Sequence, residues 1–299
     1  MIALIIGFGS AGKRHFNILK KEQKIKKIYI LTKQKIKNIN SVRNLKEVKK
    51  INPDYIIIAN ETYKHINFVK YFEKNFKNKI IIVEKPLFEK YYPLKIIKNK
   101  FIVNYNLRFH PVIKYIKNNF NLKDTFYLEC ESSSYLPIWR NKTNYINSYS
   151  ASKKKGGGVL LDLSHEIDYI SYLFNDPKAI FNFSKKISNL NIKSDDFALL
   201  FGRLPNKALY NIKLTYFNKS PTRKLQICAK DFQIYGDLLN SKMKIYYKEK
   251  IKLINLDKFS QEKSTQEMHK SILLKKYDKL CNYSNALKIN KFIDQKKLF

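Results

Sequence analysis

Three short segments of the 299-residue sequence contain residue types that can hold an anion, move a proton or orient a hydroxyl group. The first is rich in glycine, and the second ends an apolar run with an acid and a lysine. The third places a histidine between two aspartates, after three glycines. The segments are residues 7–12, 80–86 and 156–168. What each can do depends on the helices and strands that position it.

A lysine follows the pattern of a buried strand. Residues 80–83 are all Ile or Val, which is typical of a parallel strand covered on both faces, and Glu84-Lys85-Pro86 follows them. Ligands of open parallel sheets bind at the carboxyl ends of the strands. Pro86 stops the strand and stiffens the backbone beside the lysine. We therefore expect Glu84 and Lys85 at a ligand-binding edge.

The glycine-rich segment has the spacing of a dinucleotide-binding turn. Gly7 permits a tight turn, Gly9 lets the backbone approach a pyrophosphate, and Gly12 lets the following helix pack closely on the strand. The free amides at the start of that helix favour phosphate. We expect a bound dinucleotide to contact Gly7, Gly9, Ser10, Ala11 and Gly12.

The end of the second predicted strand bears on which dinucleotide is bound. An NAD site usually has an acid there that binds the ribose hydroxyls. In this sequence Thr32 and Lys33 follow the strand, and Lys35 lies close by. A hydroxyl and two lysines suit a 2′-phosphate, so we expect NADP, with NAD as the alternative.

Three polar residues follow the third predicted strand. By position, Asn60, Thr62 and His65 border the cofactor cleft and are expected to contact the cofactor. A helix N-cap is the alternative for Thr62, and a solvated helix position is the alternative for His65.

The third segment predicts an imidazole flanked by carboxylates. On a continuous helix over residues 159–174, Asp162, His165 and Asp168 lie roughly 60° apart in succession. Such neighbours orient the ring and tune its pKa for proton transfer. A surface salt-bridge cluster is the alternative, and we find no distant ligands that would complete a metal site. The glycines at 156–158 let the backbone approach a ligand or another chain segment.

Aromatic residues and two arginines are candidates for substrate binding. The faces of Trp139 and Tyr149 can stack on a sugar ring, and Arg140 can hold a phosphate or carboxylate. A core or interface anchor is the alternative for Trp139. We expect Arg108 to bind substrate and to lower the pKa of Lys85.

The elements around these segments predict two domains. Apolar runs alternate with stretches of helical length over the first 110 residues, which indicates a parallel sheet with helical crossovers. After residue 174 short alternating runs follow one another without helices, which indicates a mostly antiparallel sheet. We expect a dinucleotide-binding domain at 1–115 and a substrate-binding and oligomerisation domain at 116–299, in the α/β class.

Composition excludes several other classes of protein. The net charge of +35 comes from 53 lysines and only six arginines, and the scarcity of arginine speaks against specific binding of nucleic acid. No apolar run approaches the roughly 20 residues that span a bilayer. The three cysteines lack metal spacing, and the first residues lack the pattern of a signal peptide. These features predict a cytoplasmic protein with reduced thiols.

The order and separation of the motifs resemble the Gfo/Idh/MocA oxidoreductases. The likeness rests on Gly7-x-Gly9-x-x-Gly12, on Glu84-Lys85-Pro86, on the glycines at 156–158 with Asp162, His165 and Asp168, and on residues 104–111. It implies an N-terminal Rossmann domain and a C-terminal domain with a large open sheet that often forms a dimer or tetramer interface. It also implies that Lys85 is catalytic and that His165 with Asp162 is its acid/base partner. The family more often has three residues between that aspartate and histidine, and here only Leu163 and Ser164 intervene.

The expected activity is NAD(P)-dependent hydride transfer at a carbinol or ketone carbon. By the resemblance, the substrate is a sugar, a sugar nucleotide or a related polyol, and the arrangement around the glycine run is similar to that of family members from bacterial surface-sugar pathways. A sensory or regulatory protein that binds the cofactor without turnover is the alternative.

Overall fold

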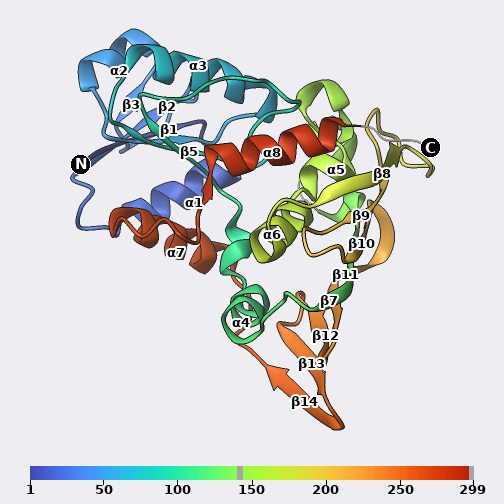
Figure 1. Ribbon diagram of the computed structural model, residues 1–299. Coiled ribbons are helices and arrows are strands. Elements are labelled where there is room, and N and C mark those ends of the chain that lie inside the picture. Colours follow the sequence, from blue (N-terminus) through green and yellow to red (C-terminus); the bar gives the residue numbers. More distant parts are fainter. Residues whose placement is uncertain (140–143, 296–299) are drawn as a thin grey trace. The chain divides into compact units, whose positions relative to one another are not determined.

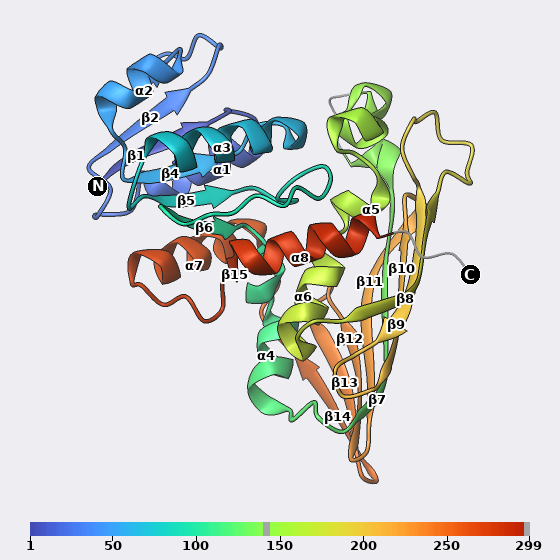
Figure 2. The ribbon, with the colours of Figure 1, turned by 45° about the horizontal axis from the view of Figure 1, so that its top comes forward.

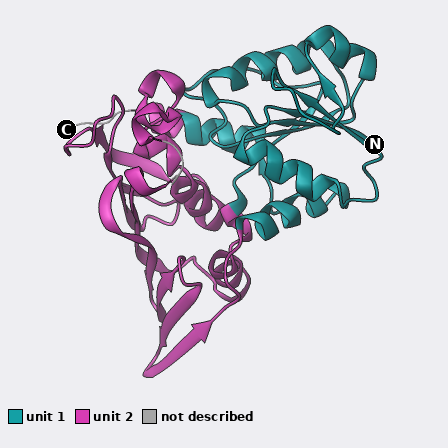
Figure 3. Ribbon diagram, turned by 180° about the vertical axis from the view of Figure 1, so that it is seen from behind, with its two compact units in different colours: residues 1–106, 261–290 teal, residues 107–260, 291–299 magenta. Residues whose placement is uncertain are grey.

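The computed structural model describes residues 1–139 and 144–295, which form two compact units (Figure 3). Unit 1 contains residues 1–106 and 261–290, and unit 2 contains residues 107–260 and the described residues from 291 onward. The division differs from the expected ranges 1–115 and 116–299, because residues 261–290 return to unit 1. They supply a strand and a helix that pack on elements of the first hundred residues.

A seven-stranded sheet forms the centre of unit 1, in the order β15-β6-β5-β4-β1-β2-β3 (Figure 2). Every neighbouring pair is parallel except β15–β6. The strands are β1 (Ile2–Ile6), β2 (Lys27–Leu31), β3 (Ser41–Val42), β4 (Tyr55–Ile58), β5 (Ile80–Val83), β6 (Lys100–Val103) and β15 (Cys281–Asn282). The predicted parallel sheet is therefore confirmed, and the short strands β3 and β15 were not predicted.

Helices connect and extend this sheet. They are α1 (Ser10–Leu19), α2 (Leu45–Ile51), α3 (His65–Asn75), α7 (Gln261–Leu273) and α8 (Tyr283–Asp294), of which the last four residues are assigned to unit 2. Helix α7 packs against α1, although some 250 residues separate them in the sequence.

Two of the three turn glycines are required by the packing of the protein itself. Gly7 has a φ of +88°, and a Cβ at Gly12 would lie 2.2 Å from the carbonyl oxygen of Gly7. Gly9 differs, because its φ is −76° and a Cβ there would meet no atom within 4 Å. The fold needs glycine at positions 7 and 12 but not at position 9.

A buried carboxylate joins three elements of unit 1. Glu84 follows β5, and its Oε1 accepts hydrogen bonds from Nε2 of His15 on α1 (2.9 Å) and from Nδ2 of Asn104 after β6 (2.8 Å). Burial alone would raise the pKa of Glu84, but the hydrogen bonds and the charges around it lower the pKa to about 2. Glu84 is therefore a carboxylate at any physiological pH.

Unit 2 is built on an eight-stranded sheet in the order β14-β13-β12-β11-β7-β10-β9-β8 (Figure 1). Only β7 and β10 are parallel neighbours, so the predicted, mostly antiparallel sheet is confirmed. The strands are β7 (Thr125–Tyr135), β8 (Lys178–Lys185), β9 (Phe197–Arg203), β10 (Leu209–Thr215), β11 (Phe217–Ala229), β12 (Phe232–Asp237), β13 (Lys242–Tyr247) and β14 (Lys250–Asn255). Strand β14 was not predicted.

Residues 159–174 were expected to form one continuous helix, but the segment is interrupted. It consists of α5 (Val159–Asp162) and α6 (His165–Phe174), with a break at Leu163 and Ser164. The hydroxyl of Ser164 donates to the carbonyl of Leu161 (2.8 Å), a local bond that competes with regular helical pairing. A further helix, α4 (Pro111–Asn119), begins the unit. None of the helices in the described part of the chain is long and apolar enough to cross a membrane.

The glycines before α5 serve close packing between chain segments. A Cβ at Gly157 would lie 2.1 Å from the carbonyl oxygen of Tyr149, and one at Gly158 would lie 2.4 Å from Oδ1 of Asp195. The other carboxylate oxygen of Asp195 accepts from the amide of Leu160 at the start of α5 (3.0 Å). Of the two uses expected for these glycines, the structure shows approach to another chain segment.

The contrast between the turn glycines gives a stability test. We expect Gly12→Ala to lower the free energy of unfolding by about 1 to 3 kcal/mol, because α1 must move away from the Gly7 carbonyl. Gly9→Ala is the matched control and should change it by less than about 0.5 kcal/mol. Urea unfolding of both variants measures the difference, and equal losses would contradict the packing explanation.

Glu84 should make the free energy of unfolding depend on pH in the acidic range. Its pKa is about 2 when folded and near its ordinary value of 4.5 when unfolded, so its stabilisation is complete above pH 4.5 and is lost as the pH falls toward 2. The loss is on the order of 3 kcal/mol. Glu84→Gln should therefore flatten the stability curve between pH 4.5 and 2, whereas Glu249→Gln, at an exposed position, should leave it unchanged. Parallel curves for wild type and Glu84→Gln would count against this assignment.

Candidate active site

The carboxyl ends of adjacent parallel strands gather the predicted cofactor residues of unit 1. Gly7 follows β1, Asn60 lies two residues after β4, Glu84 follows β5 and Asn104 follows β6. The turn and the end of β4 are in close contact, since a Cβ at Gly7 would lie 2.9 Å from Cα of Asn60. Sequence reasoning placed Gly7, Asn60 and Glu84 at this edge, and the structure brings them together there, with Asn104 beside them.

The start of α1 fits the pyrophosphate of a dinucleotide. Gly9 is the N-cap residue and supplies no side-chain cap, so the amides of the first turn, including those of Ser10 and Ala11, keep their donors for a ligand. The space that a Cβ at Gly9 would enter is open. A glycine that the fold does not require has a clear use here, which is close approach of the phosphates to the backbone.

Two carboxamide oxygens at this edge have acceptor capacity to spare. Oδ1 of Asn60 and Oδ1 of Asn104 are buried, and neither has a hydrogen-bond partner within the described ranges. Buried acceptors in that condition are costly unless a ligand or water donates to them. Both fit hydroxyl or amide donors of a bound dinucleotide, and Asn104 is a residue that the sequence prediction did not include.

His65 differs from the solvated helix residue considered as its alternative. The ring is buried, with Nε2 3.1 Å from the carbonyl oxygen of Asn60 and Nδ1 3.2 Å from those of Pro86 and Leu87. Burial lowers the pKa of His65. The His65 ring therefore lies between the end of β4 and the segment that carries Lys85, and contacts both. Thr62 is also buried, at the start of a 3-10 helix whose N-cap is Glu61.

The residues after β2 lie at the surface. The hydroxyl of Thr32 accepts from the amide of Gln34 (3.1 Å), and Lys33 and Lys35 are exposed. No acid stands at this position, as the sequence had indicated. The arrangement leaves both lysines accessible to an anion.

Lys85 is half-buried and directly follows the hydrogen-bonded Glu84. Glu84 is held by His15 and Asn104, and a cis peptide bond joins Lys85 to Pro86.

In unit 2, Asp162 has a partner that the sequence did not reveal. The hydroxyl of Tyr216, which follows β10, donates to Oδ2 of Asp162 at 2.5 Å. Burial, and then the charge of Asp162, raise the pKa of Tyr216, which keeps its proton and acts as a donor. The ring of Trp139 meets Tyr216 edge to face, with centroids 5.1 Å apart. The only signal for Tyr216 in the sequence was its place at the end of an alternating strand.

The carboxylates near His165 have separate cationic partners. Asp168 receives three hydrogen bonds from Nε and Nη2 of Arg108, at 2.7 to 3.1 Å, and both side chains are buried. The fully buried Glu166 pairs with Nε of Arg223 at 2.8 Å. The expected pair of carboxylates flanking the imidazole stays a prediction. Arg108 is paired with Asp168, and its predicted substrate role stays a prediction.

The remaining predicted substrate residues differ in accessibility. Trp139 is 36% exposed, whereas Tyr149 is half-buried in a 3-10 helix beside the glycine run. Arg140 lies outside the described residues. His165 is buried at the first position of α6.

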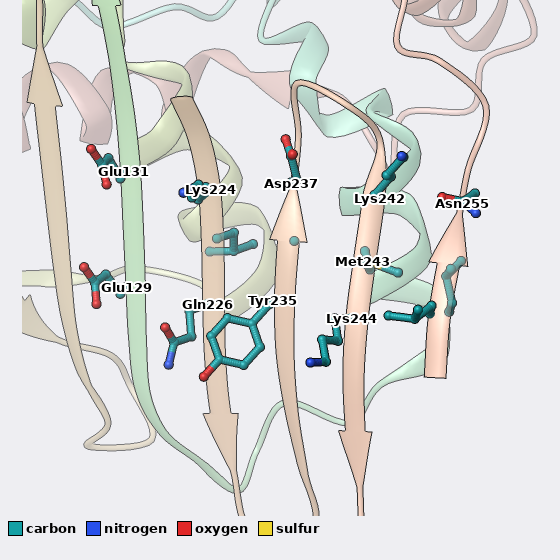
Figure 4. Close-up of a pocket in the computed structure, with 14 residues that line it drawn as sticks. Glu129, Glu131, Lys224, Gln226, Tyr235, Asp237, Lys242, Met243, Lys244 and Asn255 are labelled. Atoms are coloured by element: carbon teal, nitrogen blue, oxygen red, sulfur yellow. The ribbon is translucent and has the colours of Figure 1, made fainter. Parts of the chain in front are cut away.

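A groove of about 670 Å³ lies on the outer face of the unit 2 sheet. Figure 4 shows Glu129, Gln226, Tyr235 and Lys244 standing in a row across four strands, and strand pairing gives the same order. The groove contains none of the predicted catalytic residues. It belongs to the sheet surface and not to the candidate active site.

Comparisons with known proteins agree with this geometry. Residues 2–100 match the model of an oxidoreductase family with an NAD-binding Rossmann fold, and residues 126–238 match the GFO/IDH/MocA C-terminal domain. No curated protein matches the sequence significantly.

Solved structures share the fold at low sequence identity. A UDP-N-acetylglucosamine 3-dehydrogenase from Acidithiobacillus ferrooxidans has 16% identity and a TM-score of 0.77, with 99% of this chain and 96% of that chain covered. An oxidoreductase from Agrobacterium radiobacter, in complex with NAD+, L-tartaric acid and magnesium, has 15% identity and a TM-score of 0.81, with 99% and 95% covered. A levoglucosan dehydrogenase in complex with NADH has 14% identity and a TM-score of 0.79, with 98% and 95% covered. With both domain models matched in order, the chain belongs to the Gfo/Idh/MocA oxidoreductases.

Proposed function

We propose that the protein transfers a hydride between a nicotinamide dinucleotide and a carbinol or ketone carbon of a sugar, a sugar nucleotide or a related polyol. The observation that carries the proposal is the carboxyl edge of unit 1. There an uncapped helix start, an open space at Gly9 and two unpartnered carboxamide oxygens lie beside the segment of Lys85.

The proton of the substrate hydroxyl must leave when the hydride does. A bound nicotinamide supplies the hydride acceptor, and side chains must take the proton. We assign His165 as the principal acid/base and Asp162 as its supporting carboxylate, which Tyr216 holds in place. Lys85 orients the hydroxyl or relays its proton. The reverse assignment of Lys85 and His165 is the alternative within the same chemistry.

The relatives and one aromatic side chain support the proposed substrate class. Two structures with the same fold are named as dehydrogenases of UDP-N-acetylglucosamine and of levoglucosan, both of which are sugar compounds. The accessible ring of Trp139, next to Tyr216, suits stacking on a sugar face. With Tyr149 and Arg140 it forms our candidate substrate set, and bacterial surface-sugar synthesis is the proposed setting.

NADP is our proposed cofactor, with NAD as the alternative. The support is the absence of an acid after β2 and the two exposed lysines, Lys33 and Lys35, beside Thr32. A lysine ammonium group binds a 2′-phosphate as a point charge and gives nothing comparable to a ribose hydroxyl.

A second copy of the chain is the proposed partner of the unit 2 sheet. The face opposite the buried core carries half-exposed apolar side chains, namely Phe181, Phe183, Phe197, Leu199 and Phe201. Phe181 stacks on Phe183, and Phe201 pairs with Phe181 across the strands. Such a surface on a large open sheet favours a dimer or tetramer.

Replacing Lys85 with Met should reduce turnover of an accepted sugar substrate by about 100-fold or more while leaving dinucleotide affinity within a few fold. The methionine keeps the length of the side chain and removes its hydrogen-bond donors. Steady-state kinetics and cofactor fluorescence titration measure the two effects. Turnover like that of the wild type in this variant would refute the role of Lys85.

Native mass spectrometry of the purified protein should detect retained NADP and an assembly of two or four chains. Gly9→Ala is the matched control, because it preserves the fold but should lose most of the cofactor. Retained NAD would overturn the assignment of Thr32 and Lys33. Retained cofactor with no oxidation of any candidate sugar nucleotide would favour the sensory alternative.

A further inference from the structure

A chain of four hydrogen-bonding side chains runs through the interior of unit 1. Oε1 of Glu84 lies 2.9 Å from Nε2 of His15, and Nδ1 of His15 lies 2.7 Å from Nε2 of His269 on α7. Nδ1 of His269 lies 2.7 Å from the hydroxyl of Tyr55, the first residue of β4. His15, His269 and Tyr55 are all fully buried. None of His15, His269 and Tyr55 has a place in the proposed reaction.

The hydrogens of this chain have one arrangement that satisfies every member. The ionised Glu84 only accepts, so Nε2 of His15 carries a hydrogen. In the described chain the Tyr55 hydroxyl has no acceptor besides Nδ1 of His269, so it donates there. Burial lowers the pKa of His269, which therefore has one ring hydrogen, on Nε2, and donates it to Nδ1 of His15. Every donor then points along the chain toward Glu84.

The opposite arrangement leaves a buried donor without a partner. If His15 carried hydrogens on both nitrogens, Nε2 of His269 would have to accept and its Nδ1 would donate to the Tyr55 oxygen. The hydroxyl hydrogen of Tyr55 would then have no acceptor at a position that water does not reach. Such a loss costs about 1 to 3 kcal/mol.

We propose that His269 and Tyr55 are positioning residues that act through His15. The N–H that His269 donates occupies Nδ1 of His15 and keeps that ring neutral. Glu84 then remains a carboxylate whose charge no neighbouring imidazolium cancels. Oε1 of Glu84 accepts from His15 and Asn104, while the Glu84 side chain as a whole is 14% exposed. A fixed negative charge is thus presented at the edge where the nicotinamide is proposed to bind. This second step rests on the proposed function.

The consequence for a cofactor follows from charge. The oxidised nicotinamide ring is positive and the reduced ring is neutral, so a fixed carboxylate favours binding of the oxidised form. If His269 no longer donates a hydrogen bond to Nδ1 of His15, the His15 ring can take a second proton. The resulting ion pair with Glu84 has no net charge. The ratio of the two cofactor affinities then moves toward the reduced form.

The first test reads the ring hydrogens in the cofactor-free protein. In ¹⁵N correlation spectra at pH 7, His15 should be neutral with its hydrogen on Nε2, and the five histidines of the chain allow assignment by substitution. His269→Phe keeps an aromatic ring but donates nothing, and should give a His15 protonated on both nitrogens. His269→Gln can donate and accept, and should restore the neutral ring. An imidazolium in the wild type, or an unchanged His15 in His269→Phe, would overturn the inference.

The second test measures dissociation constants of oxidised and reduced dinucleotide. His269→Phe should lower the preference for the oxidised form by about threefold to tenfold, and Tyr55→Phe, the milder variant if His269→Phe folds poorly, should lower it in the same direction. In a Glu84→Gln background neither change should have a further effect. An equal effect in that background would refute action through Glu84. A wild type that binds neither form would refute the proposed function, and the ring spectra alone would then decide the inference.

Discussion

Several elements of unit 1 are needed to stabilise one buried carboxylate, that of Glu84. Glu84 stands at the end of a strand whose residues are all Ile and Val, where a charge without hydrogen bonds would cost several kcal/mol. His15 from α1 and Asn104 from the end of β6 supply those bonds. To reach the carboxylate, α1 must lie close to the sheet, which is possible because Gly12 has no side chain. A glycine spacing usually explained by a ligand is thus also required by a buried ion.

Unit 2 contains three buried carboxylates within one short region, and each has a hydrogen-bonding partner. Asp162, Glu166 and Asp168 are all buried, and they are held by Tyr216, Arg223 and Arg108 respectively. One partner is neutral and two are arginines. The Tyr216 hydroxyl beside Asp162 adds no positive charge, whereas the arginines beside Glu166 and Asp168 do.

The sequence was sufficient for features that depend on local pattern and failed where distant segments meet. The parallel strands, the glycine turn and the position of Lys85 follow from apolar runs and their endings, which neighbouring residues determine. The break at Leu163 and Ser164 could not be read from periodicity, which does not register a local bond such as that of the Ser164 hydroxyl to the Leu161 carbonyl. Tyr216 and His269 were missed for another reason. Their partners lie 54 and 254 residues away, and no spacing rule covers such distances.

The discontinuity of unit 1 has a consequence for the order in which the protein is made. Residues 1–106 leave the ribosome before α7 and β15 exist, so β6 has an unpaired edge and His15 and Tyr55 lack His269 during most of synthesis. The intervening 154 residues of unit 2 have to be translated before the first unit can close. The N-terminal unit is therefore among the first parts to be synthesised and among the last to be completed, and its sheet edge has to be protected from other chains in the interval.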